Sequence, residues 1–257
     1  MNTTGAWQEE FNWRIATKYK YSAPVAIYKY GIVRPAVMLT WRQRQLLRGL
    51  GDRILALIGH AEAAGFSSRP DVIAHSFGTW LIGHLLASDD ERYRRVSFGR
   101  IILTGCILRP DFDWEALIRA GRLEAVLNHY GTRDLPARLA HYFIPDSGPS
   151  GRIGFVGDGA FDVAEEGWGH SAFFAPRNLR ALLDDGLWEE FLSRPLAGLP
   201  DVLPTDRVDR SWSATPAIAR EVLRYAMLLV LGAVAFGIVG VMAAGVWSLL
   251  AWPFSAG

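Results

Sequence analysis

The sequence predicts an α/β fold built around a mostly parallel sheet and followed by one long apolar helix near the C-terminus. Three observations predict it. An apolar run at 72–74 ends at a serine between small residues and leads into an apolar helical pattern. Further strand-like runs at 100–105 and 124–130 alternate with helical patterns, as they do in βαβ units. Finally, residues 225–252 contain no charged, amide or histidine side chain.

The turn after the first apolar run has a serine, Ser76, with Ala74 two positions before it and Gly78 two positions after it. This is the spacing of a nucleophile elbow, with alanine in the first glycine position. Small flanking residues let the strand and the helix pack closely, so that the serine hydroxyl points into open space. The backbone N–H of Phe77 would then lie at a helix N-terminus, where a developing oxyanion is stabilised.

A serine nucleophile needs a histidine and a carboxylate, and the chain supplies them in the order Ser76, Asp134, His170. Asp134 follows the strand-like run 124–130 in a turn, and His170 lies in a glycine-rich loop. In this chemistry the histidine accepts the serine proton, while the aspartate fixes the histidine tautomer and stabilises the imidazolium. The sequence therefore predicts a catalytic triad of these three residues.

Two earlier carboxylates, Asp111 and Asp113, follow the strand-like run 100–105 and are alternative acids. Asp113 precedes Trp114 and Glu115 and has the position of a helix cap, which favours Asp134 as the acid. The remaining histidines lack the paired spacing of a zinc site, so we predict no metal and no cofactor.

Four stretches of the chain match one known family: 72–78, 104–105, the Asn-x-x-Gly-x-x-Asp pattern at 128–134, and 169–170. With these motifs the chain resembles a bacterial α/β-hydrolase of the lipase or serine-esterase type over about residues 3–193. The resemblance implies a three-layer α/β sandwich with a mostly parallel sheet. It also implies cleavage of carboxylic esters, which leaves a thioesterase or an amidase with the same triad as alternatives.

The N-terminus departs from the family pattern. Relatives have a strand ending in His-Gly before the first helix, and the next residue gives a second oxyanion donor. Residues 1–8 look like the segment that follows that motif, so we expect the chain to begin inside it. Met1 is then an oxyanion candidate beside Phe77. Because this strand is missing, a second interpretation stays open: a non-catalytic, membrane-tethered module that keeps the hydrolase fold for binding.

Composition and length bound the organisation of the chain. Its 257 residues suffice for one α/β domain with an appendage, and the net charge of +1 gives no electrostatic reason to expect nucleic acid. The only cysteine, Cys106, lies in an apolar run and is predicted to be a buried core residue. We expect a hydrolase domain over 1–195, a linker over 196–222, a transmembrane helix over 223–252 and a tail over 253–257.

The apolar run at 225–252 is long enough to cross a bilayer once, since about 20 helical residues suffice. Arg220 and Arg224 precede it and no charge follows, which predicts a single-pass anchor with the hydrolase domain in the cytoplasm. Small residues at four-residue spacing would permit a homodimer through this helix. An anchored, open site favours ester substrates that are lipids or acylated molecules.

A long amphipathic pattern over 37–64 predicts a helix that contains four arginines. These side chains form either a solvated face or a surface that lies against anionic lipid headgroups. They are Arg42, Arg44, Arg48 and Arg53.

Overall fold

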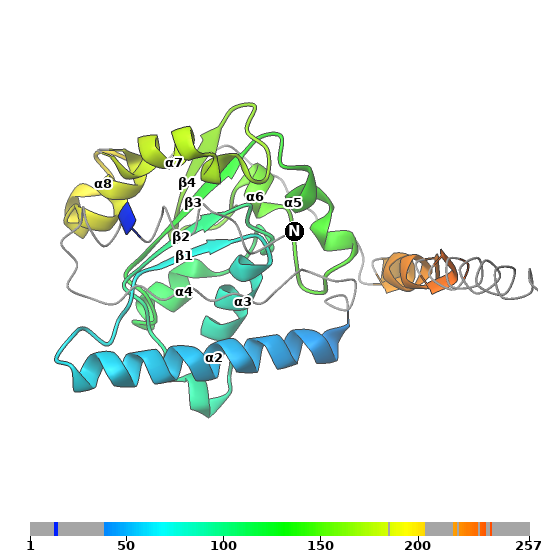
Figure 1. Ribbon diagram of the computed structural model, residues 1–257, viewed down its shortest axis with the longest axis horizontal. Helices are drawn as coiled ribbons and strands as arrows, with labels where there is room; N and C mark the ends of the chain where they lie inside the picture. Colours follow the sequence, from blue (N-terminus) through cyan, green and yellow to red (C-terminus); the bar gives the residue numbers. More distant parts are fainter. Residues whose placement is uncertain are drawn as a thin grey trace, which may run out of the picture. The chain divides into compact units, whose positions relative to one another are not determined.

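The computed structural model describes residues 13–14, 39–184, 186–203, 218–219, 221–230, 232–234 and 237. The chain divides into two compact units, Met1–Ser213 and Ala214–Gly257. Over the described residues, the first unit has an α/β fold with a four-stranded parallel sheet in the order β1-β2-β3-β4 (Figure 1). The strands are β1 (Val72–His75), β2 (Arg100–Thr104), β3 (Ala125–Gly131) and β4 (Ala160–Glu165).

Helices cover both faces of this sheet (Figure 1). The face on one side packs against α2 (Thr40–Ala63), α3 (Phe77–Leu86) and α4 (Trp114–Arg119). The opposite face packs against α7 (Pro176–Leu183) and α8 (Leu187–Ser193). Two short helices, α5 (Leu135–Leu139) and α6 (Ser150–Ile153), lie between β3 and β4 in the chain. Single 3₁₀ turns lie at Glu91–Tyr93, Ala140–Tyr142, Ala172–Phe174 and Leu196–Gly198.

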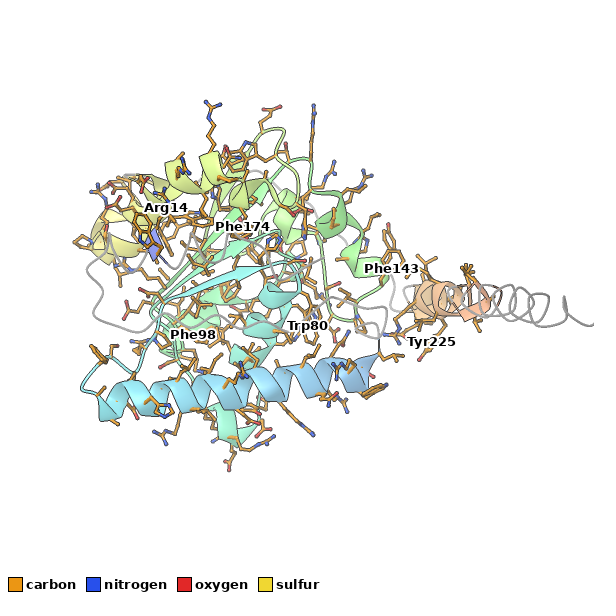
Figure 2. All side chains as sticks on the ribbon, viewed as in Figure 1. Arg14, Trp80, Phe98, Phe143, Phe174 and Tyr225 are labelled. Atoms are coloured by element: carbon orange, nitrogen blue, oxygen red, sulfur yellow. The ribbon has the colours of Figure 1, made fainter. Side chains whose placement is uncertain are left out.

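The core consists of two apolar layers, one on each face of the sheet. Side chains alternate along each strand, so Ile101 and Leu103 of β2 pack in the layer with α2 and α3. Ile102, between them, packs in the layer with α7 and α8. Figure 2 shows Trp80 on the side of α3 and Phe174 on the side of α7. Both faces of the sheet are therefore buried, as is usual for parallel strands.

The last helical region differs from its prediction. The sequence predicts one helix over 176–192, whereas the structure has α7 and α8 with a turn that includes Gly186 between them. A Cβ added to Gly186 would lie 1.9 Å from the carbonyl oxygen of Ala181, so no other residue fits this turn. Beyond α8, Leu199 and Leu203 of the expected linker are buried in the layer with α7 and α8.

The prediction of a transmembrane helix over 223–252 is wrong for the chain that the structure describes. No described helix is both long and apolar enough to cross a membrane. Within 223–252 the described residues are 223–230, 232–234 and 237, and the rest of the predicted span lies outside the described ranges. The longest described helix, α2, has 24 residues but includes four arginines. The cytoplasmic placement and the homodimer are not tested by these residues and stay predictions.

Several other predictions fall on residues outside the described ranges. Of a helix predicted over 7–16, only Trp13 and Arg14 are described, and both are helical. A strand predicted at 25–27 and the oxyanion candidate Met1 lie outside those ranges. The Arg14 guanidinium forms an ion pair with Asp184 at 2.8 Å, which links this segment to the end of α7 (Figure 2).

Candidate active site

Ser76 lies in a sharp turn between β1 and α3. Its backbone has φ 55° and ψ −126°, a combination that L-residues rarely adopt. The turn is held on both sides, because the Ser76 N–H donates to the Thr104 carbonyl at 3.0 Å and the Ser76 carbonyl accepts from the Thr79 hydroxyl at 2.6 Å. Phe77 begins α3, so its N–H belongs to the helix N-terminus, where negative charge is favoured.

Asp134 and His170, which are far apart in the sequence, form a buried hydrogen-bonded pair. The His170 Nδ1 lies 2.9 and 2.8 Å from the two carboxylate oxygens of Asp134. Asp134 has no exposed surface and His170 is 8% exposed. Because the ionised carboxylate only accepts, the Nδ1 atom carries the proton and donates it, which makes Nε2 the basic nitrogen of the neutral ring.

The Asp134 carboxylate also caps the N-terminus of α5. Its Oδ1 atom accepts the Ala137 N–H at 2.8 Å, so Asp134 is the N-cap of that helix. The cap fixes the orientation of the carboxylate that His170 contacts. One buried side chain therefore has both a structural contact and a contact with His170.

Backbone hydrogen bonds hold the loop of His170 against the loop of Asp134. The Thr132 N–H donates to the Glu165 carbonyl at 3.1 Å, and the Arg133 N–H donates to the Trp168 carbonyl at 2.9 Å. The Thr132 hydroxyl in turn accepts the Gly167 N–H at 2.9 Å. We call these three contacts the loop clasp. It places the two loops at a fixed separation at the carboxyl ends of β3 and β4.

Gly105, at the end of β2, leaves the space that His170 occupies. Its φ is +52°, and an added Cβ would lie 2.8 Å from both Nδ1 and Cε1 of the His170 ring. It would also lie 3.0 Å from Cε1 of His75. His170 therefore lies against the backbone at the end of β2 and beside His75, the residue before Ser76. The structure thus brings His170 next to the turn that includes Ser76.

Gly105→Ala is expected to destabilise the protein by about 1–3 kcal/mol and to lower any activity of the site about 100-fold. The methyl group adds left-handed backbone strain and displaces the His170 ring from Asp134. Gly121→Ala is the matched control, because Gly121 has φ +68° with nothing within 4 Å of an added Cβ. Urea unfolding and turnover rates of both variants test this prediction. Equal losses of activity in the two variants would contradict it.

His75 precedes Ser76, and its position in the sequence predicts that it points to the other face of the strand. In the structure its ring packs against Phe174 of the layer with α7 and α8, at a centroid separation of 4.9 Å. The same ring also lies 4.7 Å from that of His170. Its Nδ1 is 3.1 Å from the Thr104 hydroxyl oxygen. Burial, reinforced by the neighbouring His170 ring, lowers the pKa of His75 to about 3. His75 is thus a neutral ring beside His170 at neutral pH.

Acid is expected to weaken the fold through His75. The unfolded state takes up a proton near its ordinary pKa of 6.5, whereas the folded state does so only near about 3. The free energy of unfolding should therefore fall as the pH decreases below 6.5, by about 1.4 kcal/mol per pH unit for one such group. Urea titrations between about pH 6.5 and pH 4 should give a shallower slope for His75→Gln. An unchanged slope would exclude His75 as the group responsible.

The other candidate residues have structural partners. Asp113 caps α4 by accepting the Ala116 N–H at 2.8 Å, as its sequence position predicts. Asp111 pairs with Arg109 at 2.5 Å. Cys106 is fully buried, and burial raises the pKa of its thiol to about 11. Within the described ranges, no three His, Cys, Asp or Glu side chains come together as a metal ion would require.

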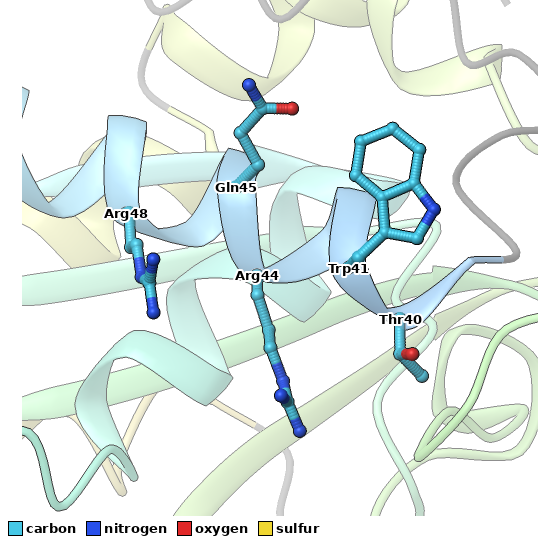
Figure 3. A pocket seen from close by; sticks show the side chains of 5 residues that line it. All are labelled: Thr40, Trp41, Arg44, Gln45 and Arg48. Carbon is cyan, nitrogen blue, oxygen red and sulfur yellow. The ribbon is translucent and has the colours of Figure 1, made fainter.

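A shallow pocket of about 270 Å³ lies on the first turns of α2 (Figure 3). Trp41 and Gln45 point to one side of the helix, and Arg44 and Arg48 point to the other. Thr40 completes the lining. None of these residues belongs to the loops around Ser76 and His170, so the pocket is separate from the candidate active site. The choice between a solvated and a lipid-facing arginine surface stays open.

Comparisons of the chain with protein-family models, with curated proteins and with solved structures found no match.

Proposed function

We propose that this protein is a serine hydrolase that cleaves carboxylic esters through an acyl-enzyme intermediate. One observation supports the proposal most strongly: a buried Asp134–His170 pair lies beside the strained turn of Ser76. A carboxylate on Nδ1 of a histidine leaves Nε2 as a base, which is what a serine nucleophile requires. Backbone strain of this kind is concentrated at functional sites.

In the proposed mechanism the Ser76 hydroxyl attacks the ester carbonyl while Nε2 of His170 accepts its proton. The Asp134 carboxylate stabilises the imidazolium that forms. The Phe77 N–H, at the start of α3, stabilises the oxyanion of the tetrahedral intermediate. His170 then protonates the leaving alkoxide, and water hydrolyses the acyl-enzyme with His170 again acting as the base.

The neutral His75 ring supports this assignment of roles. Its pKa of about 3 means that no second positive charge develops beside His170 at neutral pH. A charged neighbour at a ring separation of 4.7 Å would oppose protonation of His170 during the reaction. The surroundings of His170 are therefore compatible with its proposed role as a base.

Labelling by a fluorophosphonate tests the proposal, because this reagent reacts only with an activated serine. We expect the wild-type protein to be labelled and Ser76→Ala and His170→Ala to lose the label. Ser171→Ala is the matched control, since Ser171 is an exposed serine next to His170. Labelling retained in Ser76→Ala, or no labelling of the wild type, would contradict the proposal. Rates with paired ester and thioester substrates then define the bond that is cleaved.

A further inference from the structure

A second histidine–carboxylate pair lies on the same two strands. His129, fully buried in β3, has hydrogen bonds at both ring nitrogens. Its Nε2 is 3.0 Å from Oε1 of Glu165, the last residue of β4. Its Nδ1 accepts the indole N–H of Trp188 in α8 at 3.0 Å. We call these three residues the His129 triad.

The indole fixes the tautomer of His129. An indole nitrogen can only donate, so Nδ1 of His129 carries no proton and Nε2 must carry it. The Nε2–H group therefore donates to the Glu165 carboxylate. Burial lowers the pKa of His129, and the hydrogen bond from His129 lowers the pKa of Glu165. At neutral pH this contact joins a neutral ring to an ionised carboxylate.

The pair stands where both loops of the candidate active site begin. His129 is five positions before Asp134, and Glu165 is five positions before His170. Glu165 pairs with Gly131 in the parallel register of β3 and β4. Its backbone carbonyl accepts the Thr132 N–H of the loop clasp. Glu165 thus has two contacts: its side chain binds His129, and its backbone carbonyl binds the loop of Asp134.

The ring of His129 also packs beneath the loop of His170. Its centroid is 4.8 Å from that of Phe173 in an edge-to-face contact, and 6.2 Å from that of Trp168. Trp168 precedes His170 by two positions and Phe173 follows it by three. The buried ring of His129 therefore contacts residues that lie before and after His170 in the sequence.

We propose that His129 is a positioning residue, which Trp188 and Glu165 hold in one orientation and which sets the distance between His170 and Asp134. The inference rests on the proposed function for its effect on catalysis. Displacing a catalytic group by about 1 Å can cost about 100-fold in rate, so a small shift of the loop suffices. Loss of His129 is expected to act on the reaction through His170 and not only on the stability of the fold.

The test uses the full chain and compares His129→Phe, His129→Gln and Glu165→Ala with the wild type. We expect His129→Phe and Glu165→Ala to slow fluorophosphonate labelling by about tenfold to 100-fold. His129→Gln should lose less, because its amide can still donate to Glu165. Phe191→Leu is the matched control: this fully buried ring lies on α8, as Trp188 does, but outside the His129 triad. It should lower the melting temperature without changing the labelling rate.

A second measurement does not depend on catalysis. The downfield NMR signal of the His170 Nδ1 proton reports its hydrogen bond to Asp134, and His170→Gln identifies it. We expect His129→Phe to shift or broaden this signal and Phe191→Leu to leave it in place. If His129→Phe does not fold, two milder variants take its place: Trp188→Phe, which keeps an aromatic ring but lacks the indole donor, and Glu165→Gln, which keeps the side-chain shape.

Two outcomes overturn the inference. One is a labelling rate within about twofold of the wild type in the folded variants, with losses confined to stability. The other is an unchanged His170 proton signal. If the wild type itself is not labelled, the proposed function fails, and the NMR comparison still decides whether His129 positions His170.

Discussion

Ser76→Gly is expected to raise the free energy of unfolding by about 1 kcal/mol while lowering hydrolytic turnover about 10⁶-fold. The gain arises because φ 55° and ψ −126° strain any residue with a Cβ, whereas glycine adopts this conformation at little cost. The loss arises because the hydroxyl is the proposed nucleophile. Urea unfolding and ester turnover of the same protein preparation measure both effects.

Ser76→Ala separates the two effects, since it removes the hydroxyl but keeps the Cβ and therefore the strain. We expect it to match Ser76→Gly in lost turnover and to remain less stable than Ser76→Gly. If the alanine variant is the more stable of the two, the turn stores no strain. If either variant hydrolyses the ester at a rate close to that of the wild type, Ser76 is not the nucleophile.

Asp134→Asn should lower turnover about 10⁴-fold and leave the protein folded. The asparagine Oδ1 can still accept the Ala137 N–H, so the cap of α5 survives. The amide group then faces His170 and donates to Nδ1, which moves the histidine proton to Nε2. That tautomer cannot accept the serine proton, so the base is lost while the packing is retained.

Asp134→Ala is the companion variant, because it removes the cap as well. It should lose about 1 kcal/mol more stability than the asparagine variant through the cap alone. The unpaired buried Nδ1 of His170 adds to that loss. Thermal unfolding followed by circular dichroism, together with pre-steady-state acylation rates, distinguishes the alanine variant from the asparagine variant. An asparagine variant with nearly wild-type acylation would show that Asp134 acts only as a cap.

Local patterns were enough to predict most of the elements near the site. The apolar run before Ser76 and the small residues around it predict β1, the turn and α3, because each depends on neighbours in the sequence. The run that became β2 is apolar from Ile101 to Leu103, which is typical of a strand buried on both faces. The run that became β3 is buried throughout, although it includes Asn128 and His129.

The strand β4 was not predicted. It lies at one end of the described sheet, and most of its residues are only half-buried. Asp162 and Glu165 interrupt its apolar pattern, and a glycine-rich segment precedes it. Asp162 is needed to accept the Asn128 amide, and Glu165 to accept from His129. Its polar residues thus have tertiary roles that hide the strand from a hydropathy pattern.

The pairing of Asp134 with His170 was predicted from the order of these residues and from their positions in loops after strand-like runs, whereas the surroundings of that pair could not be predicted. Residues 104–105 were noted as part of the family resemblance, but the space that Gly105 leaves for a ring 65 positions later in the chain cannot be seen in the sequence. The contact between His75 and His170 is equally non-local. The membrane prediction rested on hydropathy alone, and no described helix is both long and apolar enough to cross a membrane.

The loop clasp has a consequence for how this site could change over evolution. Its three hydrogen bonds join the two loops directly to each other. Segments bonded in this way open and close as one cooperative unit. An insertion in either loop would therefore have to be matched by a change in the other. New substrate preferences are more accessible through segments that the clasp does not include.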